Sequence, residues 1–115
     1  MDLADLKEVM KGHATLTTSG FGVDEDQNEL LSHLQECNIS CDWLKLTQRR
    51  KQPNRKIGST YGLKAKAERW SKTYIPEGAF IAAAIHSGFE LAPKRGTTSA
   101  FLNISSKTKI NGQWI

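Results

Sequence analysis

The sequence predicts a small, mainly helical α+β domain that ends in a β-hairpin. The chain has 115 residues, which is the size of one domain. Apolar residues recur at three- and four-residue spacings in several segments of the first ninety positions. Near the C-terminal end, residues 89–92 and 99–104 have strand composition and flank a turn-forming stretch. We therefore expect one domain, made of an acidic helical part (1–44), a basic connecting segment (45–58), a helix-helix-hairpin core (59–104) and a tail (105–115).

Length and composition exclude several classes of protein. A doubly wound nucleotide-binding fold with a second domain, or a β/α barrel, does not fit into 115 residues. The longest apolar stretch runs from Ala79 to Ile85, whereas a membrane span needs about 20 residues. The first ten residues lack the cationic start of a secretory signal. We expect a cytoplasmic protein without membrane association, in which Cys37 and Cys41 are reduced.

The first half predicts helices separated by one loop and one break. Leu3, Leu6, Val9 and Met10 predict an amphipathic helix from Asp2 to Met10, and small polar residues predict a loop over 12–22. A capping arrangement at Asp24 favours a helix from there to Cys37. Asn38-Ile-Ser40 is typical of a break, after which Ser40 caps a further helix toward Arg50.

The second half of the sequence has clearer signals for where helices begin and end. Ser59 or Thr60 caps a helix whose apolar face is Leu63, Ala67 and Trp70. Pro76 at the start and Gly88 just past the end predict a helix from Pro76 to Ser87. The hairpin follows, with its turn at 93–98, and we expect the tail to be loosely held.

Two helices followed by a hairpin have the outline of a winged helix-turn-helix. In that outline the second helix enters the major groove with polar side chains. Residues 76–87 contain no Lys, Arg, Asn or Gln. A helix that is apolar all round is normally buried, so we assign this one to the core.

The charges divide the chain into two halves. Residues 1–44 hold nine acids and two bases, net −7, and residues 45–115 hold three acids and fourteen bases, net +11. Six of the twelve residues from Lys45 to Lys56 are cationic. Clustered cations indicate a polyanion partner, because neutralised phosphates release counterions. The predicted contacts are Lys45, Arg49, Arg50, Lys51, Arg55, Lys56, Lys64, Lys66, Arg69, Lys94 and Arg95.

Two other interpretations of the basic run stay open. It can be a solvated loop, or the acidic half can dock against the basic half of the same or a second copy. If nucleic acid is bound, these side chains chiefly bind phosphate, which positions a protein without specifying sequence. Guanine contacts by Arg49 or Arg50 remain an alternative. Loop amides such as that of Asn54 usually form hydrogen bonds that stabilise a turn and do not contact bases.

Aromatic stacking on single strands needs exposed rings beside the bases. Tyr61 and Tyr74 are the candidates for such stacking. Trp43 and Trp70 lie on apolar stripes and are assigned to the core.

Metal binding and catalysis find little support. His33, Cys37 and Cys41 follow one another at intervals of four residues, so they would share one face of an unbroken helix. The break expected at residues 38–40 separates Cys41 from the other two. A structural zinc site also usually has two closely spaced ligand pairs, and the sequence has only one. Glu36 and Asp42 disfavour the thiolates of the two cysteines. We predict no metal site, no cofactor and no enzymatic activity.

One part of the sequence resembles known proteins. The stretch Gly58-Ser-Thr-Tyr-Gly-Leu-Lys64, with Glu68 and Trp70, and then Tyr74-Ile-Pro-Glu-Gly-Ala-Phe-Ile-Ala-Ala-Ala-Ile-His-Ser-Gly-Phe89, resembles a core of small uncharacterised proteins of bacteria, their plasmids and phages. The resemblance covers about a third of the chain. It implies an accessory protein of a mobile element and transfers no catalytic residue. The pattern further predicts that one core contains Tyr61, Leu63, Trp70, Tyr74, Phe80 and Phe89.

The sequence therefore predicts a small regulator or accessory protein that binds nucleic acid, with DNA the expected partner. The alternative is a protein-interaction module, such as a phage or plasmid inhibitor or adaptor of a nucleic-acid-handling complex, which binds its partner through the acidic N-terminal part. A third possibility is a homodimer held by opposite charges.

Overall fold

A computed structural model describes all residues from 1 to 115 and confirms the small α+β class. Its helices are α1 (Leu3–Gly12), the 3-10 helix η1 (Gln27–His33), α2 (Leu34–Leu44), α3 (Thr60–Ser71) and α4 (Glu77–His86). Six short strands form three antiparallel hairpins: β1 (Leu16–Thr17) with β2 (Gly20–Phe21), β3 (Leu91–Pro93) with β4 (Ala100–Leu102), and β5 (Lys109–Ile110) with β6 (Gln113–Trp114). None of the helices has the length and apolarity that a membrane span requires.

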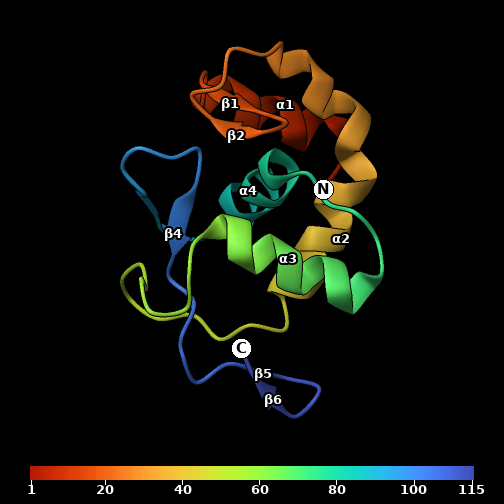
Figure 1. The fold of residues 1–115 in the computed structure, drawn as a ribbon. Coiled ribbons are helices and arrows are strands. Elements are labelled where there is room, and N and C mark those ends of the chain that lie inside the picture. The colour runs from red at the N-terminus through yellow and green to blue at the C-terminus, as the bar shows by residue number, and fades with distance from the viewer.

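Helix α4 lies at the centre of the molecule, with α1 and the β1–β2 hairpin on one side and α3 on the other (Figure 1). Every residue from Glu77 to Ala84 is buried, which confirms that the alanine-rich helix belongs to the core. The small side chains of α4 let α2 approach it closely. Trp43 of α2 packs on Phe80 of α4 with ring centroids 5.8 Å apart.

Both ends of α4 are fixed by backbone contacts. At the start, the Gly78 N–H donates to the Thr18 carbonyl at 2.9 Å, and a Cβ on Gly78 would lie 1.8 Å from the Thr17 carbonyl oxygen. At the end, Gly88 has a φ of 84° and the Phe89 N–H donates to the Ala84 carbonyl at 3.0 Å. This is the glycine-terminated helix end that the sequence predicts.

A buried carboxylate ties the second half together. Glu77 accepts hydrogen bonds from the hydroxyls of Thr60 at 2.8 Å, Ser99 at 2.6 Å and Thr98 at 3.2 Å. These partners stand at the start of α3 and just before β4, so one side chain joins two helices to the β3–β4 hairpin. The carboxylate is satisfied by hydroxyls, as a buried charge requires.

The predicted break at Asn38–Ser40 is wrong, and so is a single helix from Asp24 to Cys37. The chain forms the 3-10 helix η1 and then the uninterrupted helix α2. Polar residues end helices when their side chains compete for the backbone. Here the Ser40 hydroxyl donates to the Glu36 carbonyl one turn back, and the Asn38 amide donates to the carbonyls of Leu34 and Met1. These bonds are compatible with the helix, so it continues.

The predicted continuation of this helix to Arg50 is also wrong, because α2 ends at Leu44. From there the chain runs beside the segment that contains β4. The Arg50 N–H donates to the Asn103 carbonyl and the Asn54 N–H to the Leu102 carbonyl, both at 2.9 Å. We call residues 45–58 the basic strap.

The predicted aromatic core is only partly correct. Leu63, Phe80 and Phe89 are buried, but Tyr61 and Tyr74 are 65% and 70% exposed. Tyr61 is two positions from Leu63 on α3, which places it near the opposite side of the helix. Trp70, at the end of α3, is 38% exposed.

The tail is a hairpin and not a loose end. Asn111 and Gly112 have φ values of 54° and 77°, as a two-residue hairpin turn requires. The Ile115 N–H donates to the Thr108 carbonyl, and the buried Thr108 hydroxyl accepts from the Gln48 N–H of the basic strap. The tail is thus connected to the strap.

Candidate nucleic-acid interface

The basic strap is an ordered segment whose shape is set by Asn54. This residue is buried, and its amide group donates to the Ile104 carbonyl and the Ser106 hydroxyl, both at 2.9 Å. Its amide oxygen accepts from the Lys56 N–H at 3.0 Å. Asn54 therefore shapes the turn of the strap, which is the role that the sequence favours over base contact.

Three cations of the strap point to solvent without a partner. Arg50, Lys51 and Lys56 are exposed, and none forms an ion pair or a side-chain hydrogen bond. Lys45 is exposed as well, 3.8 Å from the Asp42 carboxylate on α2. An exposed pair of this kind contributes little and leaves the lysine available.

The structure adds two lysines that the sequence reasoning missed. Lys107 and Lys109 flank Thr108, whose hydroxyl receives the Gln48 N–H of the strap at 3.0 Å. Both lysines are exposed. They lie about fifty positions from the strap in the sequence, so no local pattern indicates that they join its charge.

Arg49 differs from the other cations of the strap. Its guanidinium donates to the carbonyls of Ser87 and Gly88, the latter at 3.3 Å, and lies 4.0 Å from the centroid of the Phe89 ring. A positive charge at the C-terminus of a helix is favourable, because the last carbonyls carry partial negative charge. The chief role of Arg49 is to cap α4.

Two more predicted contact residues face aromatic rings. Arg55 lies 5.0 Å from the centroid of Phe101. The Lys64 ammonium forms an ion pair with Glu68 at 3.3 Å and lies 5.5 Å and 5.0 Å from the rings of Tyr61 and Tyr74. With its side chain only 12% exposed, Lys64 has little charge to offer a phosphate.

The remaining predicted residues fall into two other places. Lys66 and Arg69 line a cleft between α3 and the C-terminal hairpin. Lys94 and Arg95 are exposed in the turn between β3 and β4. Arg50, Lys51 and Lys56 thus lie together on the strap, whereas Lys66 and Arg69 belong to the cleft beside α3.

The acidic half does not neutralise the strap. Of the ion pairs in the structure, only Lys45 with Asp42 joins the two halves, and these residues are three positions apart. Figure 1 shows α1 and the β1–β2 hairpin at one end of the molecule and the strap with the β5–β6 hairpin toward the other. The acidic α1 and the basic strap thus lie toward different ends of the molecule.

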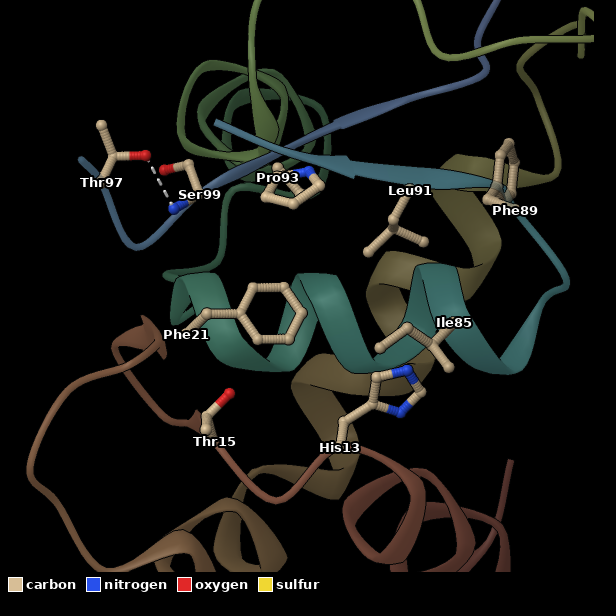
Figure 2. A pocket seen from close by; sticks show the side chains of 10 residues that line it. His13, Thr15, Phe21, Ile85, Phe89, Leu91, Pro93, Thr97 and Ser99 are labelled. Atoms are coloured by element: carbon tan, nitrogen blue, oxygen red, sulfur yellow. Dashed lines mark hydrogen bonds between the residues drawn. The ribbon is translucent and has the colours of Figure 1, made fainter. Parts of the chain in front are cut away.

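A separate apolar pocket lies over α4, between the β1–β2 and β3–β4 hairpins (Figure 2). Its volume is about 500 Å³, and Phe21, Ile85 and Leu91 supply much of its apolar wall. Figure 2 shows the His13 ring pointing toward Ile85. The His13 Nδ1 lies 3.1 Å from the Val9 carbonyl oxygen, so in the neutral ring Nδ1 carries the proton and Nε2 is an acceptor.

The two cysteines are buried in α2. Burial, together with the smaller effects of the neighbouring Cys41 and Glu36, raises the pKa of Cys37 to about 12. The thiol is therefore protonated at neutral pH. Helix α2 has no break between Cys37 and Cys41. Even so, no three His, Cys, Asp or Glu side chains are grouped so that they could hold a metal ion.

Comparisons of this chain with protein-family models, with curated proteins and with solved structures return no match.

Proposed function

We propose that this chain is a small nucleic-acid-binding protein, a regulator or accessory factor, which binds phosphates through the basic strap. One observation supports this proposal above the others: the backbone of the strap is fixed beside β4 while the charges of Arg50, Lys51 and Lys56 are exposed and unpaired. Because the backbone is already fixed, binding need not order it, and only the side chains lose freedom. Lys107 adds an exposed cation next to Thr108, whose hydroxyl accepts from the Gln48 N–H of the strap.

The proposed binding is independent of sequence. By its order in the chain, α4 would be the reading helix of a winged helix-turn-helix, but residues Glu77 to Ala84 are all buried, so that face is not available to a groove. Contacts limited to phosphate fix the position of a protein on its partner without reading bases. The partner we propose is DNA, and the resemblance to plasmid and phage proteins fits an accessory role of this kind.

The test is charge reversal with a matched control. Arg50→Glu with Lys51→Glu changes the net charge by the same amount as Lys7→Glu with Lys11→Glu, and all four side chains are exposed. If the strap binds phosphate, the first pair weakens binding to unrelated duplexes at least tenfold at low salt, and the second pair weakens it far less. About four phosphate contacts predict a slope of roughly −3 to −4 for log affinity against log salt. Equal effects of both pairs would refute a localised interface.

A second candidate function, a protein-interaction module, is favoured by the apolar pocket. A cavity of about 500 Å³ is large enough for a bulky apolar side chain of a partner. The acidic residues Asp24, Glu25 and Asp26 directly follow the β1–β2 hairpin that borders the pocket, so the partner we propose carries a basic surface around that side chain. A stoichiometric partner that survives nuclease treatment and is lost with Leu91→Asp, but kept with Arg50→Glu, supports this function.

A further inference from the structure

A cleft of about 290 Å³ between α3 and the C-terminal hairpin combines tryptophan rings with positive charge. Trp70, Lys66 and Arg69 come from α3, and Trp114 comes from β6. The buried Trp43 of α2 forms part of its floor. We call this the tryptophan cleft.

The two outer tryptophans are unusually accessible for their size. The residue Trp114 is 64% exposed and Trp70 is 38% exposed. The Trp114 ring is presented by the β5–β6 hairpin, whose Asn111-Gly112 turn is well suited to hold two strands. Exposed aromatic rings gathered at one cleft supply faces on which a flat ligand can stack.

The charge of the cleft favours an anion. Lys66 and Arg69 are three positions apart on α3, so they share one side of the helix, and neither forms an ion pair. The Lys109 ammonium lies 4.3 Å from the centroid of the Trp114 ring. Glu68 accepts hydrogen bonds from Lys64 and from the Ile75 N–H, so it is not turned to the cleft.

We propose that the tryptophan cleft binds single-stranded nucleic acid, with a base stacked on Trp114 and the adjoining phosphates on Lys66 and Arg69. The inference rests on the proposed nucleic-acid-binding function and deepens it. Stacking on an indole requires a base that is free of its neighbours. In a duplex the bases are already stacked on one another, so the cleft adds affinity for single strands only. Tyr61 and Tyr74, the stacking candidates of the sequence, lie beside Lys64 and outside the cleft.

The experiment compares a fluorescein-labelled oligothymidylate of about a dozen nucleotides with a labelled duplex of the same length, by fluorescence anisotropy. Trp114→Ala removes the exposed ring. We expect it to weaken single-strand binding roughly 5- to 100-fold, the range of one base-aromatic stack, and duplex binding less than about twofold. Trp114→Phe retains a ring and restores most of the affinity. Tyr74→Ala removes an equally exposed ring outside the cleft and leaves both affinities unchanged.

A second readout uses the protein without substitution. A base stacked on Trp114 quenches indole fluorescence, so oligothymidylate should quench the wild type and leave Trp114→Phe less quenched at saturation. Thermal unfolding of each variant verifies that it is folded. The quenching of the wild type tests the stacked base even if Trp114→Ala does not fold.

The outcomes separate this inference from the proposed function. If single strand and duplex bind equally and Trp114→Ala changes neither, the cleft is not a binding site while phosphate binding by the strap stands. If Tyr74→Ala weakens single-strand binding and Trp114→Ala does not, the stacking site lies beside Lys64 and the inference is wrong. If the wild type binds neither oligonucleotide, the proposed function fails together with the inference.

Discussion

Replacing Arg49 with glutamine should destabilise the protein without weakening nucleic-acid binding. The guanidinium of Arg49 donates to two carbonyls at the end of α4 and covers the Phe89 ring at 4.0 Å. A cation at a helix C-terminus contributes about 0.3–1 kcal/mol, and an exposed cation–π contact about 0.5–1 kcal/mol. Because Arg49 is solvent-exposed, its hydrogen bonds add only a fraction more. We expect a total loss of about 1–2 kcal/mol.

Thermal and urea unfolding measure this loss. An unfolding entropy of about 2.1 cal/mol/K per residue converts it into a fall in Tm of about 4–8 °C. The matched control is Arg50→Gln at the next position, where the side chain has no partner. That change should leave stability within about 0.5 kcal/mol and weaken DNA binding.

The two substitutions should therefore act in opposite ways, one on folding and the other on binding. Arg49→Gln should retain wild-type affinity for duplex DNA within about twofold at a temperature where it is fully folded. If Arg49→Gln keeps the wild-type Tm and loses affinity as Arg50→Gln does, the assignment of Arg49 to the end of α4 is wrong. The phosphate-binding surface would then include it.

Three further predictions concern buried groups. Gly78→Ala should lower the free energy of unfolding by about 3 kcal/mol or more, because the new Cβ would lie 1.8 Å from the Thr17 carbonyl oxygen. The control is Gly62→Ala on α3, where the new Cβ meets nothing within 4 Å, and this change should raise the free energy of unfolding by about 0.5–1 kcal/mol. Urea unfolding midpoints compare the two variants. Asn54→Ala should cost about 2 kcal/mol in the same assay and lower binding as well, because the strap loses its buried hydrogen bonds. Cys37 should react with iodoacetamide at pH 9 several hundred times more slowly in the folded protein than in urea, because its pKa is raised from 9.0 to about 12. The folded state favours the protonated thiol, so the contribution of Cys37 to stability is complete below pH 9 and is lost as the pH rises toward 12.

The elements that the sequence predicts correctly have strong local signals. Pro76 and Gly88 define both ends of α4, and the apolar residues between them are buried. The β3–β4 hairpin follows from strand composition on both sides of a turn. In each case the local preference and the tertiary packing favour the same structure.

The sequence-based predictions are wrong where tertiary contacts determine the local structure. Asn38 stays helical because its amide binds Met1, a partner thirty-seven positions away that no local pattern reveals. The strap follows β4 because of backbone hydrogen bonds to residues 102–105, and the sequence contains no signal for that pairing. The tail does have a signal in the sequence: Asn111-Gly112 is a preferred pair for a tight hairpin turn.

The candidate site is likewise predicted only in part from the sequence. Composition alone indicates a cationic segment, but which cations are free depends on what each side chain meets. Arg49 and Arg50 are adjacent in the sequence, yet one caps a helix and the other faces solvent. Trp114 has no signal in the sequence, because an isolated tryptophan has no periodicity, and the cations beside it come from α3, more than forty positions away.

The separation of charge in the molecule makes the two candidate functions compatible. A polyanion attracts the strap and repels α1 and the acidic segment that follows β2, so it would orient the protein with its acidic end outward. The apolar pocket lies between the two hairpins at the side of α4 and is not lined by any cation of the strap. A phosphate-bound molecule would therefore keep the pocket open to a protein partner. Leu91→Asp should then abolish protein binding and leave the salt dependence of DNA binding unchanged, and a change in that dependence would show that the two surfaces overlap.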